Sequence, residues 1–270
     1  MSFCLESYFK RIHYHGPRSA TLETLQQLHH AHTYAIAFEN LDVLLGRTIK
    51  TDDDSIFTKL VSAGRGGWCF EQNGLFRRVL QELGFTVTNL SGRVLLANPE
   101  QLPARTHRIT LVTLGDEAWL ADVGFGGKTL PSPIRLRAGE VLDTAYGRYS
   151  LEQEEGRWLL KYQDSEKTLS MYCFNLEPQY DSDYEMGNHY VSTWPASHFR
   201  HCLTLSLYHP EGGRSTLYSA AEKMAVFSHP EELYRNVQDT FNLRFDDPEQ
   251  GISLDEFTSL LERLSQTGER

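Results

Sequence analysis

Cys69 has the sequence surroundings of a nucleophilic cysteine. Two glycines directly before Trp-Cys allow a tight turn, and the apolar spacing that follows predicts a helix over 69–83, so Cys69 falls in its first turn. The unpaired amides and the positive dipole end of a helix stabilise a thiolate there. A buried structural cysteine is the alternative, but it would gain nothing from Arg65 upstream or from Glu71 and Asn73 downstream. We therefore favour a nucleophile.

A thiolate nucleophile needs a base, and the base needs a group that orients it. His107 lies in a predicted strand over 105–114, and a two-residue turn joins this strand to another over 117–123. Such a turn places Ile109 opposite Asp122, so His107 and Asp122 project from the same face as diagonal neighbours, about 7–8 Å apart at Cα. This separation allows a histidine–carboxylate hydrogen bond. The alternative is a chance pair in a polar hairpin.

A glycine-rich loop follows Asp122 immediately. Three of the four residues at 124–127 are glycine, and Lys128 comes next. Such a loop lets its amides approach a ligand closely, as a phosphate or pyrophosphate requires. The pattern is neither a Walker A loop nor a dinucleotide-binding fingerprint, and a plain turn explains it equally well from the pattern alone.

Helices and strands that position these residues follow from the apolar periodicity. The first third is predicted to be helical, with Thr21 and Asp54 as N-caps and Gly64 and Gly84 as stops. The middle third, to about Pro195, is predicted to be mostly an antiparallel sheet or barrel. The predicted helices cover 21–31, 54–63 and 69–83, and the predicted strands cover 85–96, 105–114, 117–123, 149–154 and 157–163.

The last third is predicted to be mixed. A strand over 201–208 meets a turn at 210–213, and a helix follows with apolar residues at helical spacing around Val237. Ser253 and Glu256 form a capping-box signature for a final helix. Neither an internal repeat nor an obvious linker interrupts the chain, so we expect its parts to pack as one body.

Composition excludes several classes of protein. The chain has 270 residues and a net charge of −10, which argues against a nucleic-acid partner. It has no apolar stretch long enough for a membrane span and no secretory signal pattern. The four cysteines are far apart, which favours free thiols in a reducing cytoplasm. The histidine groups lack metal-ligand spacing, so we expect no metal site.

Four segments resemble the arylamine N-acetyltransferase family, and most closely its bacterial members described as N-hydroxyarylamine O-acetyltransferases. The similarity covers nearly the whole chain and departs from the family pattern at Trp68, where tyrosine is more usual, and at Ala37, where proline is. The four segments are Arg65-Gly-Gly-Trp-Cys69-Phe-Glu71-Gln-Asn73, Arg105-Thr-His107, Asp122 to Gly127 and Phe38 to Val43.

This resemblance implies a cysteine-protease-like catalytic triad of Cys69, His107 and Asp122. The thiolate would take the acetyl group of acetyl-coenzyme A, keep it as an acetyl-cysteine, and pass it to an aromatic amine, hydrazine or hydroxylamine in a ping-pong reaction. The chain would thus be an acyltransferase of xenobiotic metabolism, with coenzyme A and small aromatic molecules as partners, and with no metal, nucleic acid or membrane. His107 would accept and donate the proton, and Asp122 would orient it.

The resemblance further implies an α+β fold in three domains: an N-terminal helical bundle over 1–85, a central antiparallel β-barrel over 86–195 and a C-terminal α/β lid over 196–270. We expect the nucleophile in the first domain and the histidine and aspartate in the second. The remaining expected contacts are Phe125, Gly126 and Gly127 for coenzyme A, and Phe38, Trp68 and Phe125 for a flat acceptor ring. These aromatic residues also fit ordinary core packing.

Two rival functions remain at this stage. A cysteine hydrolase or transglutaminase-like enzyme would use the same cysteine, histidine and aspartate in the same order. A non-catalytic binding module could retain the fold without the chemistry. A stable acetyl adduct formed from acetyl-coenzyme A alone would distinguish the acetyltransferase from the hydrolase. Labelling of Cys69 by a thiol reagent at mildly acidic pH would exclude the binding module.

Overall fold

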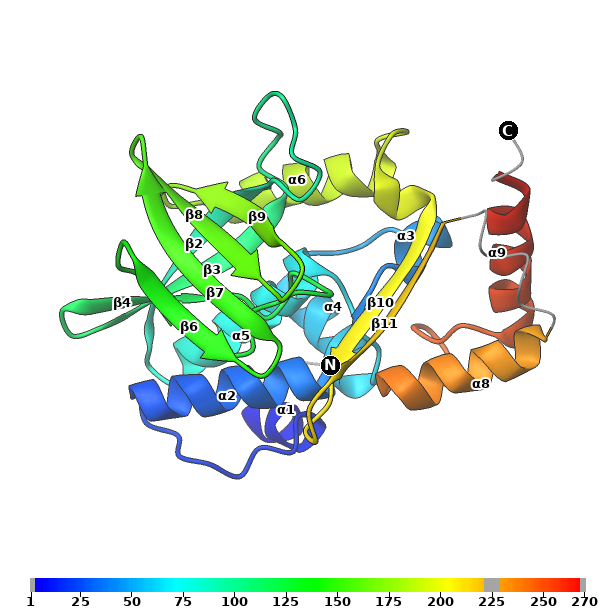
Figure 1. Cartoon of the computed structure of the whole chain (residues 1–270). Helices are drawn as coiled ribbons and strands as arrows, with labels where there is room; N and C mark the ends of the chain where they lie inside the picture. The colour runs from blue at the N-terminus through cyan, green and yellow to red at the C-terminus, as the bar shows by residue number, and fades with distance from the viewer. Residues whose placement is uncertain (1–2, 221–228, 268–270) are drawn as a thin grey trace.

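The N-terminal part of the chain folds as helices (Figure 1). The computed structural model describes residues 3–220 and 229–267. Thr21 caps its helix as predicted, with its side chain accepting from the Thr24 amide. The helices are α1 (Leu5–Arg11), α2 (Leu22–Ala35), α3 (Leu41–Leu44), α4 (Asp53–Phe57), which continues as a π-helical turn (Thr58–Ser62), and α5 (Cys69–Glu82).

The N-cap predicted for the second helix was wrong by two residues. Asp52, rather than Asp54, accepts a hydrogen bond from the Ser55 amide and caps α4. Three consecutive aspartates occupy 52–54, and each has a side chain suited to capping. Gly64 and Gly84 end their helices in the left-handed region, with φ of +70° and +82°, as predicted.

The middle of the chain forms an eight-stranded antiparallel sheet in the order β5-β4-β3-β2-β9-β8-β7-β6. The edge strands β5 and β6 contact each other, so the sheet curls into a nearly closed barrel. Its interior is packed with apolar side chains. The strands are β2 (Thr86–Val94), β3 (His107–Leu114), β4 (Glu117–Ala121), β5 (Ile134–Arg135), β6 (Glu140–Thr144), β7 (Gly147–Glu154), β8 (Arg157–Gln163) and β9 (Thr168–Phe174).

One helix lies where the sequence pattern predicted mostly strands. This helix, α6 (Asp181–Thr193), buries Tyr184, Asn188 and Val191 and leaves Met186 and Tyr190 exposed. With so few apolar residues on its buried face, its helical period is weak in the sequence.

The C-terminal part adds a small sheet and two helices. β1 (Phe38–Glu39) pairs with β10 (Cys202–Tyr208), which pairs with β11 (Arg214–Ala220), and a 3₁₀ turn (His198–Arg200) precedes β10. The helices α8 (Pro230–Phe241) and α9 (Leu254–Thr267) pack against this sheet and each other. The capping box that opens α9 is confirmed, because Ser253 and Glu256 exchange side-chain-to-amide hydrogen bonds.

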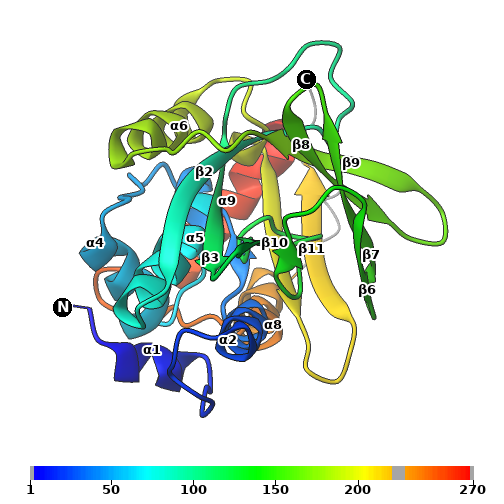
Figure 2. The same cartoon turned by 90° about the vertical axis from the view of Figure 1, so that its left-hand side faces the viewer.

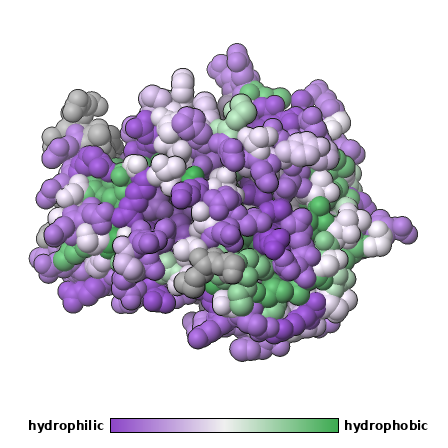
Figure 3. Space-filling view, turned by 180° about the vertical axis from the view of Figure 1, so that it is seen from behind, coloured by the Kyte–Doolittle hydropathy of each residue, from purple (hydrophilic) through white to green (hydrophobic). Residues whose placement is uncertain are grey.

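Long-range contacts join the three parts. β1 comes from the helical part but pairs with β10, and α2 contacts both α5 and β10 (Figures 1 and 2). The fold is therefore α+β, with an N-terminal helical part, a barrel-like antiparallel sheet and a C-terminal α/β part. On the face opposite to that of Figure 1, hydrophilic residues cover most of the surface and apolar residues gather in smaller patches (Figure 3). None of the described helices is long and apolar enough to cross a membrane.

Candidate active site

Cys69 is the first residue of α5, as the sequence predicted. Trp68, directly before it, has an extended backbone, and its amide donates to Oε2 of Glu71 at 3.1 Å, which fixes the start of the helix. The thiol is partly buried, and its Sγ lies 3.7 Å from the backbone oxygen of Thr106. The helix start therefore brings Cys69 next to the beginning of β3.

A tight hairpin brings His107 and Asp122 together. The predicted register is confirmed, with Thr110 opposite Ala121 and Leu114 opposite Glu117. His107 starts β3 and Asp122 directly follows β4, so the two face each other at the same end of the hairpin. Nε2 of His107 lies 2.7 Å from Oδ2 of Asp122, and the two residues are 3% and 0% exposed. The structure thus places a histidine–carboxylate pair beside the thiol.

Both oxygens of the Asp122 carboxylate are fully hydrogen-bonded. Oδ1 accepts from Nδ2 of Asn73 at 2.9 Å and from the Gly124 amide at 3.1 Å, and Oδ2 accepts from the Tyr172 hydroxyl at 3.0 Å as well as from His107. Burial alone would raise the pKa of Asp122, but the charge of His107 and these donors hold it below its ordinary value. Asp122 is therefore a buried carboxylate kept ionised.

The charge of His107 follows from the same neighbours. Burial lowers its pKa, but the charge and hydrogen bond of Asp122, reinforced by Cys69, outweigh burial and raise the pKa to about 10. Because Nε2 faces Asp122, Nδ1 is the ring nitrogen left for the Cys69 sulfur. His107 is thus an imidazolium at neutral pH, placed between a carboxylate and a thiol. This arrangement suits proton transfer to and from a sulfur nucleophile.

Arg65 and Glu71 form buried ion pairs, whereas Asn73 hydrogen-bonds the Asp122 carboxylate. Nη2 of Arg65 binds Oε1 of Glu39 at 2.7 Å, and Nζ of Lys59 binds Oε1 of Glu71 at 2.8 Å. Asp42 bridges the two pairs, at 3.1 Å from Arg65 and 2.6 Å from Lys59. These five residues form a buried ion cluster that fixes the turn before Cys69 and the first turn of α5.

The glycine loop passes directly over the start of α5. A Cβ at Gly124 would lie 2.9 Å from the Cys69 Cα, so only glycine fits there without a shift. Gly126 has φ of +91° and packs against the Phe38 ring, whereas the position of a Cβ at Gly127 is open, with its nearest neighbour at 4.0 Å. The backbone at Gly127 is therefore open to close approach by a ligand.

The three aromatic residues expected near an acceptor differ in accessibility. Phe38 and Trp68 are 6% and 1% exposed and belong to one core cluster, in which the Trp68 ring packs edge-on against Phe70 and Phe199. Phe125 is partly exposed and meets the His107 ring edge-on at 4.9 Å. Of the three, Phe125 is the side chain that contacts the histidine.

Tyr172 and His29 contact Asp122, and sequence reasoning did not identify either of them. Tyr172 lies in β9, and His29 lies in α2, where its Nε2 accepts from the Asp122 backbone amide at 3.2 Å. Neither belongs to a motif, and both reach Asp122 through long-range packing. No local pattern in the sequence marks them.

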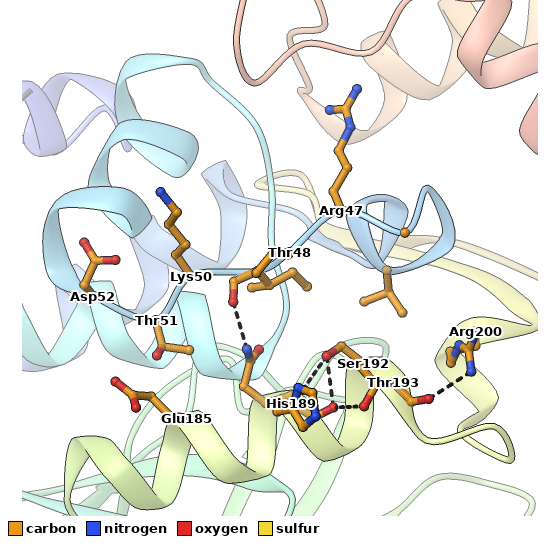
Figure 4. Close-up of a pocket in the computed structure, with 14 residues that line it drawn as sticks. Arg47, Thr48, Lys50, Thr51, Asp52, Glu185, His189, Ser192, Thr193 and Arg200 are labelled. Carbon is orange, nitrogen blue, oxygen red and sulfur yellow. Dashed lines mark hydrogen bonds between the residues drawn. The ribbon is translucent and has the colours of Figure 1, made fainter.

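A sizeable cavity lies away from this site. It has a volume of about 610 Å³ and is bounded by the segment after α3 and by α6, and Figure 4 shows its lining, including Lys50, His189 and Arg200. Cys69, His107 and Asp122 do not line it. The described part of the chain also contains no cluster of three or more metal-ligating side chains.

Comparisons with known proteins agree with this geometry. The family model described as "N-acetyltransferase" matches residues 21–246. The chain is 46% identical to an arylamine N-acetyltransferase of Escherichia coli, over 97% of this chain and 96% of that protein. It is also 44% identical, over the same two shares, to a Salmonella typhimurium protein named arylamine N-acetyltransferase / N-hydroxyarylamine O-acetyltransferase.

Solved structures show the same similarity in three dimensions. The Salmonella typhimurium arylamine N-acetyltransferase superposes with a TM-score of 0.91, covering 97% of this chain and 99% of that one, at 44% identity. A Mycobacterium marinum arylamine N-acetyltransferase in complex with CoA gives a TM-score of 0.87 at 31% identity, covering 97% and 99%. These similarities favour an acetyltransferase over a cysteine hydrolase or transglutaminase-like enzyme. The chain is an acyltransferase that belongs to the arylamine N-acetyltransferase family.

Proposed function

We propose that Cys69, His107 and Asp122 form a catalytic triad that moves an acetyl group from acetyl-coenzyme A to aromatic amines, arylhydrazines or N-hydroxyarylamines. The observation that carries this proposal is the buried ion pair of His107 and Asp122 beside a cysteine at a helix start. A thiolate and an imidazolium can coexist there because Asp122 stabilises the positive charge. The family membership and the CoA-bound relative support the choice of donor.

The first half-reaction acetylates the enzyme. The Cys69 thiolate attacks the thioester carbonyl, so that a bond from Sγ to the acetyl carbon forms and the bond to the sulfur of coenzyme A breaks. The imidazolium of His107 gives its proton to the departing thiolate. The enzyme is left with an acetylated Cys69 and a neutral His107, and Asp122 holds the ring in the orientation needed for the next step.

The second half-reaction returns the enzyme to its starting state. The amine nitrogen, or the oxygen of a hydroxylamine, attacks the acetyl carbon and displaces Cys69 as a thiolate. His107 accepts the proton that the nucleophile loses and becomes an imidazolium again. Atoms and charges therefore balance over the full cycle without a metal or a redox partner.

Ligand contacts are assigned by accessibility. Phe125, Gly126 and Gly127 are the proposed coenzyme A contacts, supported by the open backbone at Gly127. Phe125 also offers an edge to an acceptor ring near His107, while Phe38 and Trp68 belong to the buried cluster against which Cys69 packs. All four cysteines are free thiols, which supports a cytoplasmic location.

Mass spectrometry with acetyl-coenzyme A alone tests this function. The protein should gain one acetyl group on Cys69 in the absence of amine and lose it when an arylamine is added. Initial rates at varied concentrations of both substrates should give parallel double-reciprocal lines. Rapid release of acetate without an adduct would instead support a hydrolase. Intersecting lines with an isolable ternary complex would overturn the acetyl-cysteine scheme.

A further inference from the structure

Helix α2 carries two fully buried histidines on the side that faces α5. His29 and His32 are one helical turn apart, and both are 0% exposed. Their rings pack edge-on against the same Phe76 ring, at centroid distances of 5.5 Å and 5.6 Å. Neither histidine takes part in the acetyl transfer described above. Their hydrogen bonds, however, connect His29 to Asp122 and connect His32, through Gln72, to the turn before Cys69.

The bond between His29 and Asp122 fixes the tautomer of His29. The Asp122 amide donates to Nε2 of His29 at 3.2 Å. A backbone N–H is always a donor, so Nε2 must carry a lone pair, and the ring proton must be on Nδ1. The backbone of Pro131 is the nearest backbone acceptor to the ring, although Nδ1 makes no hydrogen bond of ordinary geometry with it.

The tautomer of His32 is fixed in the opposite sense. Nε2 of the Gln72 amide donates to the Gly67 oxygen at 2.8 Å, so Oε1 is the Gln72 atom that lies 3.2 Å from Nε2 of His32. An oxygen at this distance requires a proton on Nε2 of His32. Nδ1 then accepts from the Tyr8 hydroxyl at 2.9 Å.

The two chains of hydrogen bonds end at the residues that set the triad geometry. His29 holds the backbone of Asp122. His32 acts through Gln72, one turn after Cys69 in α5, and through Gly67 in the turn before it. Helix α2 thereby fixes the carboxylate and the nucleophile relative to each other, from a single rigid element.

His29 must be neutral on Nε2 for its bond to the Asp122 amide to exist. At His32 the Gln72 oxygen requires a proton on Nε2, and burial keeps the ring neutral, so that Nδ1 can accept from Tyr8. Burial lowers the pKa of each to about 3, although the charge of Asp122 opposes this at His29. The ionisable neighbours are Asp122 and His30 at His29, and His29 and Arg11 at His32. A proton on Nε2 of His29 would place two donors face to face at the Asp122 amide.

We propose that His29 and His32 are positioning residues that hold Asp122 and the start of α5 in register as neutral imidazoles of opposite tautomer, with the proton on Nδ1 of His29 and on Nε2 of His32. The tautomer of His29 follows from hydrogen-bond geometry, and that of His32 from geometry together with its complete burial. The effect on turnover rests on the function proposed above. The two parts are therefore tested by separate measurements.

Nitrogen NMR of the wild-type protein tests the tautomers. In protein labelled with ¹⁵N-histidine, the resonances of the two residues, assigned with the single variants His29→Gln and His32→Gln, should show one protonated nitrogen each between pH 5.5 and 8. That nitrogen should be Nδ1 in His29 and Nε2 in His32. The same tautomer in both residues, or an imidazolium signal from either in this pH range, would overturn the proposal. This measurement needs no substrate, and the variants serve only to assign the resonances.

Two substitutions at His29 test the positioning role. His29→Phe keeps a ring against Phe76 but removes the acceptor, whereas His29→Gln keeps an acceptor near the place of Nε2. We expect His29→Phe to slow acetylation of Cys69 roughly 3- to 10-fold, the range for one lost hydrogen bond. It should also shift the pH midpoint of Cys69 alkylation by iodoacetamide. His29→Gln should remain close to the wild type in both measurements.

The control is His30→Phe. His30 lies next to His29 on α2, is exposed and stacks on Tyr34 without contacting the triad. It should leave the acetylation rate and the alkylation profile unchanged. If His29→Phe and His29→Gln lose thermal stability alike while their alkylation profiles match the wild type, His29 has only a packing role. If the wild type itself forms no acetyl-cysteine, the function proposed above fails, while alkylation and NMR still decide the positioning role.

Discussion

Nε2 of His107 lies 2.7 Å from Oδ2 of Asp122, although β3 and β4 do not pair these two residues directly. They meet because the two-residue turn sets the register of the hairpin, which puts both side chains on the same face at its open end. The hydrogen bond therefore depends on a local turn and on the extra donors that hold the carboxylate in place.

Replacing Asp122 by asparagine tests whether this bond orients and charges the histidine. Asparagine keeps the shape but removes the charge that raises the pKa of His107, so the imidazolium gives way to neutral imidazole beside a neutral thiol. We expect the acetylation rate to fall by about 10²–10⁴-fold, as for orienting aspartates in other triads. Alkylation of Cys69 by iodoacetamide near pH 6 should be lost.

The competing role for Asp122 is to fix the glycine loop through the Gly124 amide. In that case Asp122→Asn should raise KM for acetyl-coenzyme A and leave the pH profile of alkylation unchanged. An unshifted alkylation profile would therefore remove Asp122 from the triad.

Replacing Cys69 by serine should abolish acetyl transfer and preserve the fold. The change is nearly isosteric, but a serine hydroxyl is far less ionised than a thiol beside the same histidine. Steady-state rates should fall below about 1% of the wild type, with unchanged circular dichroism. The single variants Cys4→Ala, Cys173→Ala and Cys202→Ala serve as controls and should turn over normally. Activity of several per cent in Cys69→Ser would mean that another residue is the nucleophile.

Replacing Gly124 by alanine should lower activity by displacing the nucleophile. The new Cβ would lie 2.9 Å from the Cys69 Cα and 3.0 Å from Nδ2 of Asn73, so the start of α5 or the loop must move. Because productive geometry tolerates only small displacements, we expect a loss of roughly tenfold or more in the acetylation rate. Gly84→Ala, at the far end of α5, is the control: it should cost stability through its positive φ and leave the rate unchanged. Equal rates for both variants would contradict this account.

Stability should fall on both sides of a maximum near neutral pH. His29 and His32 have lowered pKa values in the folded state, so between pH 6.5 and about 3 only the unfolded chain binds their protons, and acidification favours unfolding. His107 has a raised pKa of about 10, so between pH 6.5 and 10 the folded state holds a proton that the unfolded chain lacks. Its contribution is lost as the pH rises through that range.

Urea unfolding at pH 5.5, 7 and 9 measures both effects. The free energy of unfolding should be highest at pH 7. In Asp122→Asn the decline from pH 7 to 9 should become shallower, since His107 no longer keeps its extra proton. A wild-type free energy of unfolding that rises steadily from pH 5.5 to 9 would show that these histidines do not govern the pH dependence.

Features set by neighbouring residues were predictable from the sequence. The glycine turn and apolar stripe placed Cys69 at a helix start, and the length of the hairpin turn fixed which face carries His107 and Asp122. The capping box at Ser253 is likewise local. The four family segments then identified the chemistry, because each keeps its residues at fixed spacing along the chain.

Other features depend on distant parts of the chain, and only the tertiary structure decided them. Helix α6 has a weak period because little of it is buried, and the choice of Asp52 over Asp54 as a cap depends on where the helix starts to pack. Trp68 could have faced a ligand, yet it packs in the core.

The surroundings of Asp122 show this dependence most clearly. His29 precedes it by about a third of the chain length and Tyr172 follows it by 50 residues, yet both donate to or accept from it. A sequence fixes which groups can hydrogen-bond, but which of them meet is decided when helices and strands bury their apolar faces together. Burial then excludes water, so most buried polar groups pair with partners within the protein. The residues of the proposed triad could therefore be named from the chain, and the residues that hold them in place could not.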